Sequence, residues 1–200
     1  MNRNPRAPAA SHAGPEAGSQ PAAPLFQSAL GDRWRELPPC VQRLHSGRNV
    51  ETFSGRAHIA RGRGLVAWLA AWLVGLPKAG ADVPLTVTMT CTPDGEVWER
   101  SFAGRRLRSV LTPSPKPYHF RERFGLATYE LELPVEDAVL HFVVRRGWLL
   151  GIPLPSLLLP RSCTREFAAD GAFHFDVSLY APVTGGLIVR YRGCLKPDAA

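Results

Sequence analysis

Apolar and polar residues alternate over most of the chain beyond residue 50, which is typical of strands that bury one face. The clearest stretch is 83–90, in which Val83, Leu85, Val87 and Met89 alternate with a proline and three threonines. Turn signals such as Pro93-Asp94-Gly95 and Asp170-Gly171 lie between such stretches and predict hairpins. We predict about nine or ten short strands, over residues 51–60, 83–90, 97–101, 106–112, 118–123, 126–133, 138–145, 161–168, 172–180 and 187–195.

Apolar residues recur at helical spacing in three other places. The first is 25–36, the second runs from Pro39 to Leu44 with the proline at its first position, and the third is 65–76. The predicted strands follow one another without the strand–helix alternation that a parallel sheet requires. The sequence therefore predicts an α+β fold, dominated by a strongly curved antiparallel sheet or a partly closed barrel.

Two segments are unusually apolar. The helix 65–76 carries its large side chains on one stripe, which consists of Leu65, Trp68, Leu69, Trp72, Leu73 and Leu76. Its length of about 18 Å is too short for a bilayer core of about 30 Å, so no transmembrane segment is expected. The segment 147–160 begins at Gly147-Trp148 and contains three prolines, which exclude a regular helix. Each segment is either plain core or the lining or cover of an apolar cavity.

The composition fits one domain preceded by a tail. The chain has 200 residues, a net charge of +7 and four cysteines. Residues 1–24 are rich in proline and alanine and are expected to be a disordered tail, followed by a single domain over 25–200. The cysteines form no CxxC pair, so neither a metal site nor a disulfide framework is expected, and reduced thiols favour a cytoplasmic location.

Few residues suggest catalysis. His174 and Asp176 lie two apart on a predicted strand and therefore share a face, where they form either a general-base pair or a solvated surface pair. Glu122 lies between Arg121 and Arg123, and such a carboxylate would stay ionised. The chain contains no GxSxG or HExxH motif. The sequence favours a protein without cofactor or catalytic activity, with an enzyme using His174, Asp176 and Glu122 as the alternative.

Basic residues are concentrated in 100–123, which contains seven of them and only one acidic residue, Glu122. This stretch is either a solvated strand face or a patch for an anionic ligand. Nucleic-acid binding would require more exposed aromatic residues among the charges and is not expected.

Several short motifs in a fixed order resemble an uncharacterised bacterial family, domain of unknown function 4166, over about residues 25–196. The matching residues are Leu37-Pro38-Pro39 with His45, Gly55 up to Arg61-Gly62-Arg63-Gly64, Gly75-Leu76-Pro77, Asp82-Val83-Pro84, Trp98 with Phe102-Ala103-Gly104, Glu122-Arg123-Phe124-Gly125, Gly151-Ile152-Pro153-Leu154-Pro155 with Pro160, Phe173-His174-Phe175-Asp176-Val177 and Tyr191-Arg192-Gly193. The resemblance implies an accessory or substrate-handling module, with an oxidoreductase-like partner acting in trans.

These observations lead to one leading hypothesis and two alternatives. The leading hypothesis is a binding module in which a curved sheet holds an apolar or amphipathic, lipid-like small molecule, whose anionic head group would meet Arg121, Arg123 or Arg161. The expected ligand-binding residues are Trp68, Trp72, Glu122, Arg123, Trp148, Arg161, His174 and Asp176. The alternatives are the enzyme described above and a peripheral membrane protein whose tryptophan helix lies in the lipid interface.

Overall fold

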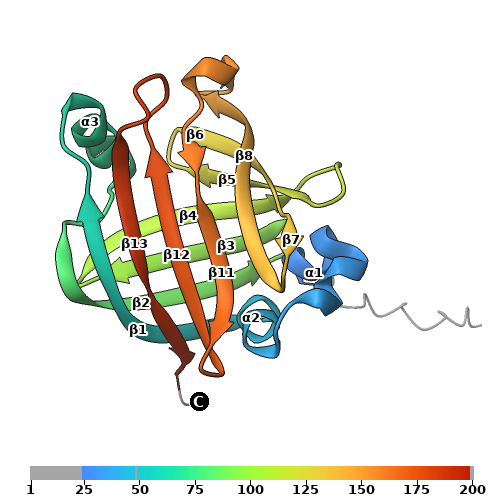
Figure 1. Cartoon of the computed structure of the whole chain (residues 1–200). Coiled ribbons are helices and arrows are strands. Elements are labelled where there is room, and N and C mark those ends of the chain that lie inside the picture. Colours follow the sequence, from blue (N-terminus) through green and yellow to red (C-terminus); the bar gives the residue numbers. More distant parts are fainter. Residues whose placement is uncertain (1–23, 48, 199–200) are drawn as a thin grey trace, which may run out of the picture.

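The protein is a closed antiparallel barrel of ten strands, seen in a computed structural model that describes residues 24–47 and 49–198 (Figure 1). The barrel strands are β1 (Val50–Arg61), β2 (Gly80–Thr92), β3 (Gly95–Phe102), β4 (Arg105–Pro113), β5 (His119–Phe124), β6 (Ala127–Glu132), β8 (Val139–Leu149), β11 (Thr164–Ala169), β12 (Ala172–Tyr180) and β13 (Leu187–Pro197). Three two-residue strands are added at the margins: β7 (Val135–Glu136), β9 (Ile152–Pro153) and β10 (Arg161–Ser162). The predicted α+β class is confirmed, and the sheet closes completely.

Closure occurs where β13 pairs with both β1 and β12. Two glycines allow β1 and β13 to approach closely. A Cβ atom on Gly193 would lie 2.0 Å from the backbone oxygen of Arg56, and one on Gly55 would lie 2.0 Å from that of Cys194. No side chain fits at either position, because real Cβ contacts are never this short. These glycines are therefore required for the seam.

The alternation predicted from the sequence separates the two faces of the wall. On β12, Phe173 and Phe175 are buried inside the barrel, whereas His174 lies between them on the outer face. The same rule places Leu85, Val87 and Met89 of β2 inside, as expected. Residues two apart thus line one continuous interior.

One end of the barrel is closed by the N-terminal helices. These are α1 (Leu25–Leu30), the 3-10 helix η1 (Gly31–Glu36) and α2 (Pro39–His45). The predicted proline is at the first position of α2. Phe26 and Leu30 of α1 and Leu44 of α2 are buried, and α2 lies against β11 and β12. We call this the α1 end.

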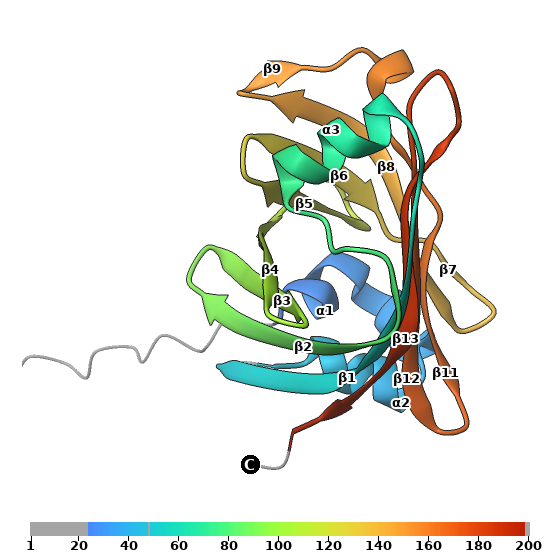
Figure 2. The ribbon, with the colours of Figure 1, turned by 90° about the vertical axis from the view of Figure 1, so that its left-hand side faces the viewer.

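The opposite end, which we call the α3 end, carries the helix α3 (Leu65–Val74) and the segment with the 3-10 helix η2 (Ser156–Leu158). Figure 2 shows α3 and β9 in the upper half of the molecule and α2 in the lower half. The predicted helix is confirmed. Among the described residues, no helix is long and apolar enough to cross a membrane. The predicted tail, 1–24, falls almost wholly outside the described residues.

Candidate functional site

The barrel encloses a cavity in which about 190 Å³ is open to the centres of water molecules. Phe26 and Leu44 form its floor at the α1 end, and Ala70 and Leu76 contribute to its roof at the α3 end. Most of the wall is apolar, with residues such as Phe142 projecting from the strands. Concave, mainly apolar cavities with a few polar groups are typical of small-molecule sites.

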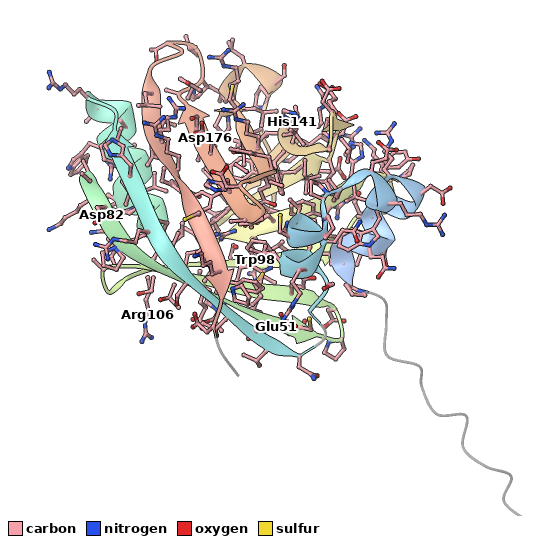
Figure 3. The ribbon with its side chains drawn as sticks, turned by 60° about the horizontal axis from the view of Figure 1, so that its bottom comes forward. Glu51, Asp82, Trp98, Arg106, His141 and Asp176 are labelled. Carbon is pink, nitrogen blue, oxygen red and sulfur yellow. The ribbon has the colours of Figure 1, made fainter. Side chains whose placement is uncertain are left out.

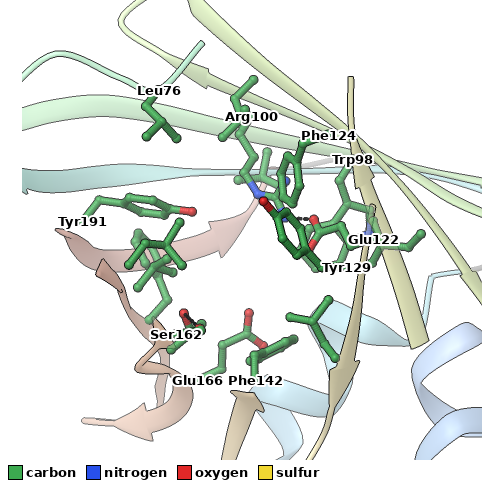
Figure 4. Close-up of a pocket in the computed structure, with 18 of the residues that line it drawn as sticks. Leu76, Trp98, Arg100, Glu122, Phe124, Tyr129, Phe142, Ser162, Glu166 and Tyr191 are labelled. Atoms are coloured by element: carbon green, nitrogen blue, oxygen red, sulfur yellow. Dashed lines mark hydrogen bonds and ion pairs between the residues drawn. The ribbon is translucent and has the colours of Figure 1, made fainter. Parts of the chain in front are cut away.

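A buried ion pair lies on one side of this cavity. Arg100 of β3 donates to Glu122 of β5 at 3.2 Å (Figure 4). It also donates to the hydroxyl of Ser109 at 2.9 Å. The guanidinium group lies 4.9 Å above the Trp98 ring. Only 13% of the Arg100 side chain and 10% of the Glu122 side chain are exposed. Two opposite charges are thus held together in a mainly apolar space.

Two tyrosines face the same space. Figure 4 shows the hydroxyl groups of Tyr129 and Tyr191 directed toward the Arg100–Glu122 pair. Burial raises the pKa of Tyr191 to about 12, to which the carboxylates of Glu122 and Glu166 contribute against the opposing charge of Arg100. Burial also raises the pKa of Tyr129. Both phenols therefore remain neutral at physiological pH and can donate or accept hydrogen bonds.

A second buried pair lies toward the α1 end. Nε2 of His45 is 2.5 Å from a carboxylate oxygen of Glu166, and the His45 side chain is fully buried. The imidazole packs against Phe26, with ring centroids 3.9 Å apart, and stacks on Trp98. Its Nδ1 has no hydrogen-bond partner among the described residues. This pair fixes α2 to β11 and places the Glu166 carboxyl at the cavity wall.

Of the predicted ligand-binding residues, Glu122 lines the cavity. Its sequence neighbours Arg121 and Arg123 project to the other side of β5, because side chains alternate along a strand. The cation that meets Glu122 is instead Arg100, which comes from β3. Arg161 is exposed and stacks on Tyr180. None of the three arginines expected to meet an anionic head group lines the cavity.

The predicted tryptophans also lie outside it. Trp68 and Trp72 are 62% and 70% exposed, because α3 turns its small residues Ala67 and Ala70 toward the barrel. Trp148 lies on the outer side of β8, beneath the guanidinium of Arg121. The large apolar stripe was interpreted as core or cavity cover. This is wrong for the four exposed side chains, which are Leu65, Trp68, Leu69 and Trp72, and right for Leu76. The side chain of Leu73 lies outside the described residues.

The loop 147–160 likewise covers little of the cavity. Pro160 lines it, but Leu150, Ile152, Leu157 and Leu158 are exposed. The three prolines and the short η2 hold this segment outward. The expected cover is therefore incomplete at the α3 end.

His174 and Asp176 lie on the outer face of β12, on the opposite side of the wall from Glu122. Asp176 accepts hydrogen bonds from Nε and Nη2 of Arg190 at 2.9 and 2.6 Å, on the outer surface of the barrel (Figure 3). The hydrogen bond from Arg190 holds the pKa of Asp176 below its ordinary value. His174 stacks on Phe167. The three proposed catalytic residues do not converge, so the structure does not support an enzyme built on them.

The basic stretch 100–123 is divided between the two faces. Arg100 points inward, while Lys116 and Arg121 lie outside and meet the carboxylate of Glu130 at 3.4 and 3.7 Å. Burial alone would raise the pKa of Glu130, but Ser114 and the two cations lower it. The stretch is therefore not a single patch for an anionic ligand.

Sequence reasoning did not place Arg100, Tyr129, Glu166, Tyr191 or His45 among the site residues, although His45 and Tyr191 lie in motifs of the family resemblance and Arg100 lies in the basic stretch. One signal was present for Arg100, since Glu96, Trp98, Arg100 and Phe102 alternate on the buried face of β3. A charged residue at an inward position of an apolar stripe indicates a buried polar site. His45 and Glu166 are 121 positions apart, and no local pattern connects them.

The fold and cavity define a class: a closed antiparallel barrel with an internal, mainly apolar cavity that contains paired charges. The chain matches the model of domain of unknown function (DUF4166) over residues 37–195 and belongs to that family. No curated protein and no solved structure matches the chain. Among the described residues, no group of His, Cys, Asp and Glu is arranged to hold a metal ion.

Proposed function

We propose that this protein binds a small, uncharged amphipathic molecule inside the barrel, with its apolar part against the walls and one hydroxyl or carbonyl group at Arg100 and Glu122. The observation that carries the proposal is the buried ion pair in a mainly apolar cavity. A few polar groups in an apolar site orient a ligand and select for its polar end.

The charges of the site favour an uncharged ligand. Arg100 is already neutralised by Glu122, and Glu166 is a second carboxylate on the same cavity, held by His45. An anionic head group would add another negative charge where no cation is free among the cavity residues described, and an unpaired buried charge is costly. A hydroxyl group, by contrast, can donate to Glu122 and accept from Arg100 or Tyr191.

The size of the cavity favours a short-chain molecule. Its 190 Å³ lies below the range of about 300–1,000 Å³ that holds drug-sized ligands. A single short aliphatic chain fits such a volume better than a two-chain lipid. Each buried methylene group contributes about 0.8 kcal/mol, so affinity rises with chain length until the cavity is filled.

The proposal is tested by displacement of the fluorescent probe N-phenylnaphthylamine from the purified protein. Decanol, decanoate and decane share one chain length and differ only in the head group. We expect decanol to displace the probe at lower concentration than either of the others, and mass spectrometry of an organic extract to yield an uncharged amphipathic molecule. Equal or better displacement by decanoate contradicts the proposal.

Two variants of adjacent residues show whether the probe occupies the cavity. Val144 lines the cavity, whereas Val143 precedes it on β8 and faces outward. Val144→Phe places a ring in the cavity and is expected to abolish probe binding, with a stability loss of about 1–3 kcal/mol. Val143→Phe, in the same strand, is the matched control and should bind normally. Unchanged binding in folded Val144→Phe would locate the ligand elsewhere.

A further inference from the structure

The α3 end of the barrel exposes an unusual number of large apolar side chains. Of the twelve described large hydrophobic residues that are strongly exposed, all but Val50 belong to connections at this end. We call these eleven residues the apolar rim. They come from α3, from the β5–β6 turn, from the segment after β8 and from the β12–β13 turn. Large apolar patches exposed on monomeric soluble proteins usually mark a site of interaction.

The apolar rim lies at the end of the barrel where Ala70, Leu76 and Pro160 line the cavity. α3 contributes Trp68 and Trp72 to the rim and Ala70 to the cavity from its other face. Pro160 lines the cavity at the end of the segment that carries Leu157 and Leu158. Whatever the rim contacts is therefore separated from the cavity by one short helix and one loop.

The charges at the two ends differ in sign. The connections at the α3 end, which are 61–81, 102–106, 123–128, 146–163 and 180–189, contain eight basic residues and no acidic one. The strand connections at the α1 end, which are 92–95, 113–119, 132–139 and 169–172, contain five acidic residues and only Lys116 as a basic one. The helices within 25–45 add two acidic and three basic residues, so this end has seven acidic and four basic residues in all. Asp82, near the start of β2, is already paired with Arg56.

Six of the basic side chains at the α3 end are exposed and form no ion pair with a described carboxylate; they are Arg63, Lys78, Arg105, Arg106, Arg123 and Arg161. Each basic residue near an anionic membrane surface strengthens binding about fivefold. The end of the molecule that exposes tryptophan and leucine is thus also the end that an anionic surface attracts.

We propose that the apolar rim docks on an anionic lipid bilayer, with the cavity facing the membrane. Tryptophans beside apolar and basic side chains are the composition that partitions into the lipid interface. This inference rests on the proposed function, because docking would let the barrel take up its uncharged amphipathic ligand without exposing the apolar part of that ligand to water.

The test is co-sedimentation with vesicles of phosphatidylcholine alone and of phosphatidylcholine with about one third phosphatidylserine. We expect binding to the anionic vesicles, weakened by salt, and little binding to the neutral ones. Trp68→Ser/Trp72→Ser should weaken it at least about tenfold without unfolding the protein, since both side chains are exposed. Val50→Ser, which removes an equally exposed apolar residue at the α1 end, is the matched control.

A charge variant separates the two contributions. Arg123→Gln/Arg161→Gln should weaken binding to anionic vesicles about thirtyfold, whereas Lys116→Gln at the α1 end should leave it unchanged. Equal recovery with neutral and anionic vesicles, or no recovery with either, overturns the proposal. A third result would also overturn it: the unchanged protein is a dimer that does not bind vesicles, and the tryptophan variant is a monomer. The rim would then be an interface between copies of this chain.

The experiments distinguish a failure of the docking proposal from a failure of the proposed function. Val144→Phe should lose the probe from the cavity yet bind vesicles as the unchanged protein does. The tryptophan variant should retain probe binding in the absence of vesicles. If the unchanged protein binds vesicles but not the probe, only the proposed ligand binding in the cavity is refuted. If it binds the probe but not vesicles, only the docking proposal is refuted.

Discussion

Replacing Arg100 with methionine while Glu122 remains should destabilise the protein by about 3–4 kcal/mol at pH 7. The carboxylate would stay buried without its cation, and removing one partner of a buried pair typically costs about 3–5 kcal/mol. Proton uptake sets an upper limit, because protonating an ordinary glutamate with a pKa of about 4.3 costs about 3.7 kcal/mol at pH 7. Ser109 would also lose its donor.

The limit set by proton uptake also makes the predicted loss of stability depend on pH. At pH 5 the protonation cost falls to about 1 kcal/mol, so the variant should then lie much closer to the unchanged protein. The double variant Arg100→Met/Glu122→Leu removes both charges and should be within about 1 kcal/mol of the unchanged protein. It should still bind decane but no longer prefer decanol, because the polar end of the cavity is gone.

Urea unfolding followed by tryptophan fluorescence measures these differences. Arg108→Met is the control, since Arg108 is exposed on the outer side of β4 and should change stability by no more than about 0.5 kcal/mol. A loss below about 1 kcal/mol for Arg100→Met, the same at pH 5 and pH 7, would refute the reasoning. A double variant as unstable as Arg100→Met would refute it equally.

Three further predictions concern the rest of the barrel. Tyr191 should ionise only near pH 12, and the difference in ultraviolet absorbance between the unchanged protein and Tyr191→Phe shows this; a step near pH 10 would mean that the phenol is solvated. Gly193→Ala should destabilise by about 3 kcal/mol or more, because its Cβ would clash with a backbone oxygen across the seam; an unaffected urea midpoint would show that β1 and β13 can separate at no cost. Asp176→Asn should destabilise by about 1–2 kcal/mol at pH 7. Because the pKa of Asp176 is lowered, this contribution is present above about pH 4 and lost as the pH falls further; a difference that persists into strong acid would exclude the ion pair as its source.

The strands could be predicted because burial repeats every second residue. In β2 and β12 the alternation indicated both the strand and its inner face. Closure could not be predicted, since the pairing of β1 with β13 joins segments about 130 residues apart. The small part that the segment 147–160 plays in covering the cavity could not be predicted either. It depends on where β8 ends in the folded protein, and the periodicity of the sequence does not give that position.

The helix α3 shows where pattern reasoning failed. Its large apolar stripe indicated the buried side, yet the structure buries Ala67 instead. Arg61 donates to the backbone oxygens of Ala67 and Pro77, which holds both parts of the α3 segment close to the wall. The small residues Ala67 and Ala70 thus face the barrel, and the large residues of α3 face outward. Glu122 was correctly singled out from the sequence, but its expected partners, Arg121 and Arg123, lie on the other side of β5. Its actual partner is Arg100.

The seam between β1 and β13 also decides when the barrel can form during synthesis. Of the ten barrel strands, β13 comes last along the chain, and it completes the hydrogen bonding of both β1 and β12. A chain that lacks residues 187–197 therefore leaves two unpaired strand edges, which readily join other chains. Pairings between distant segments are also slow to form. The nascent protein thus depends on protection from aggregation until β13 has left the ribosome.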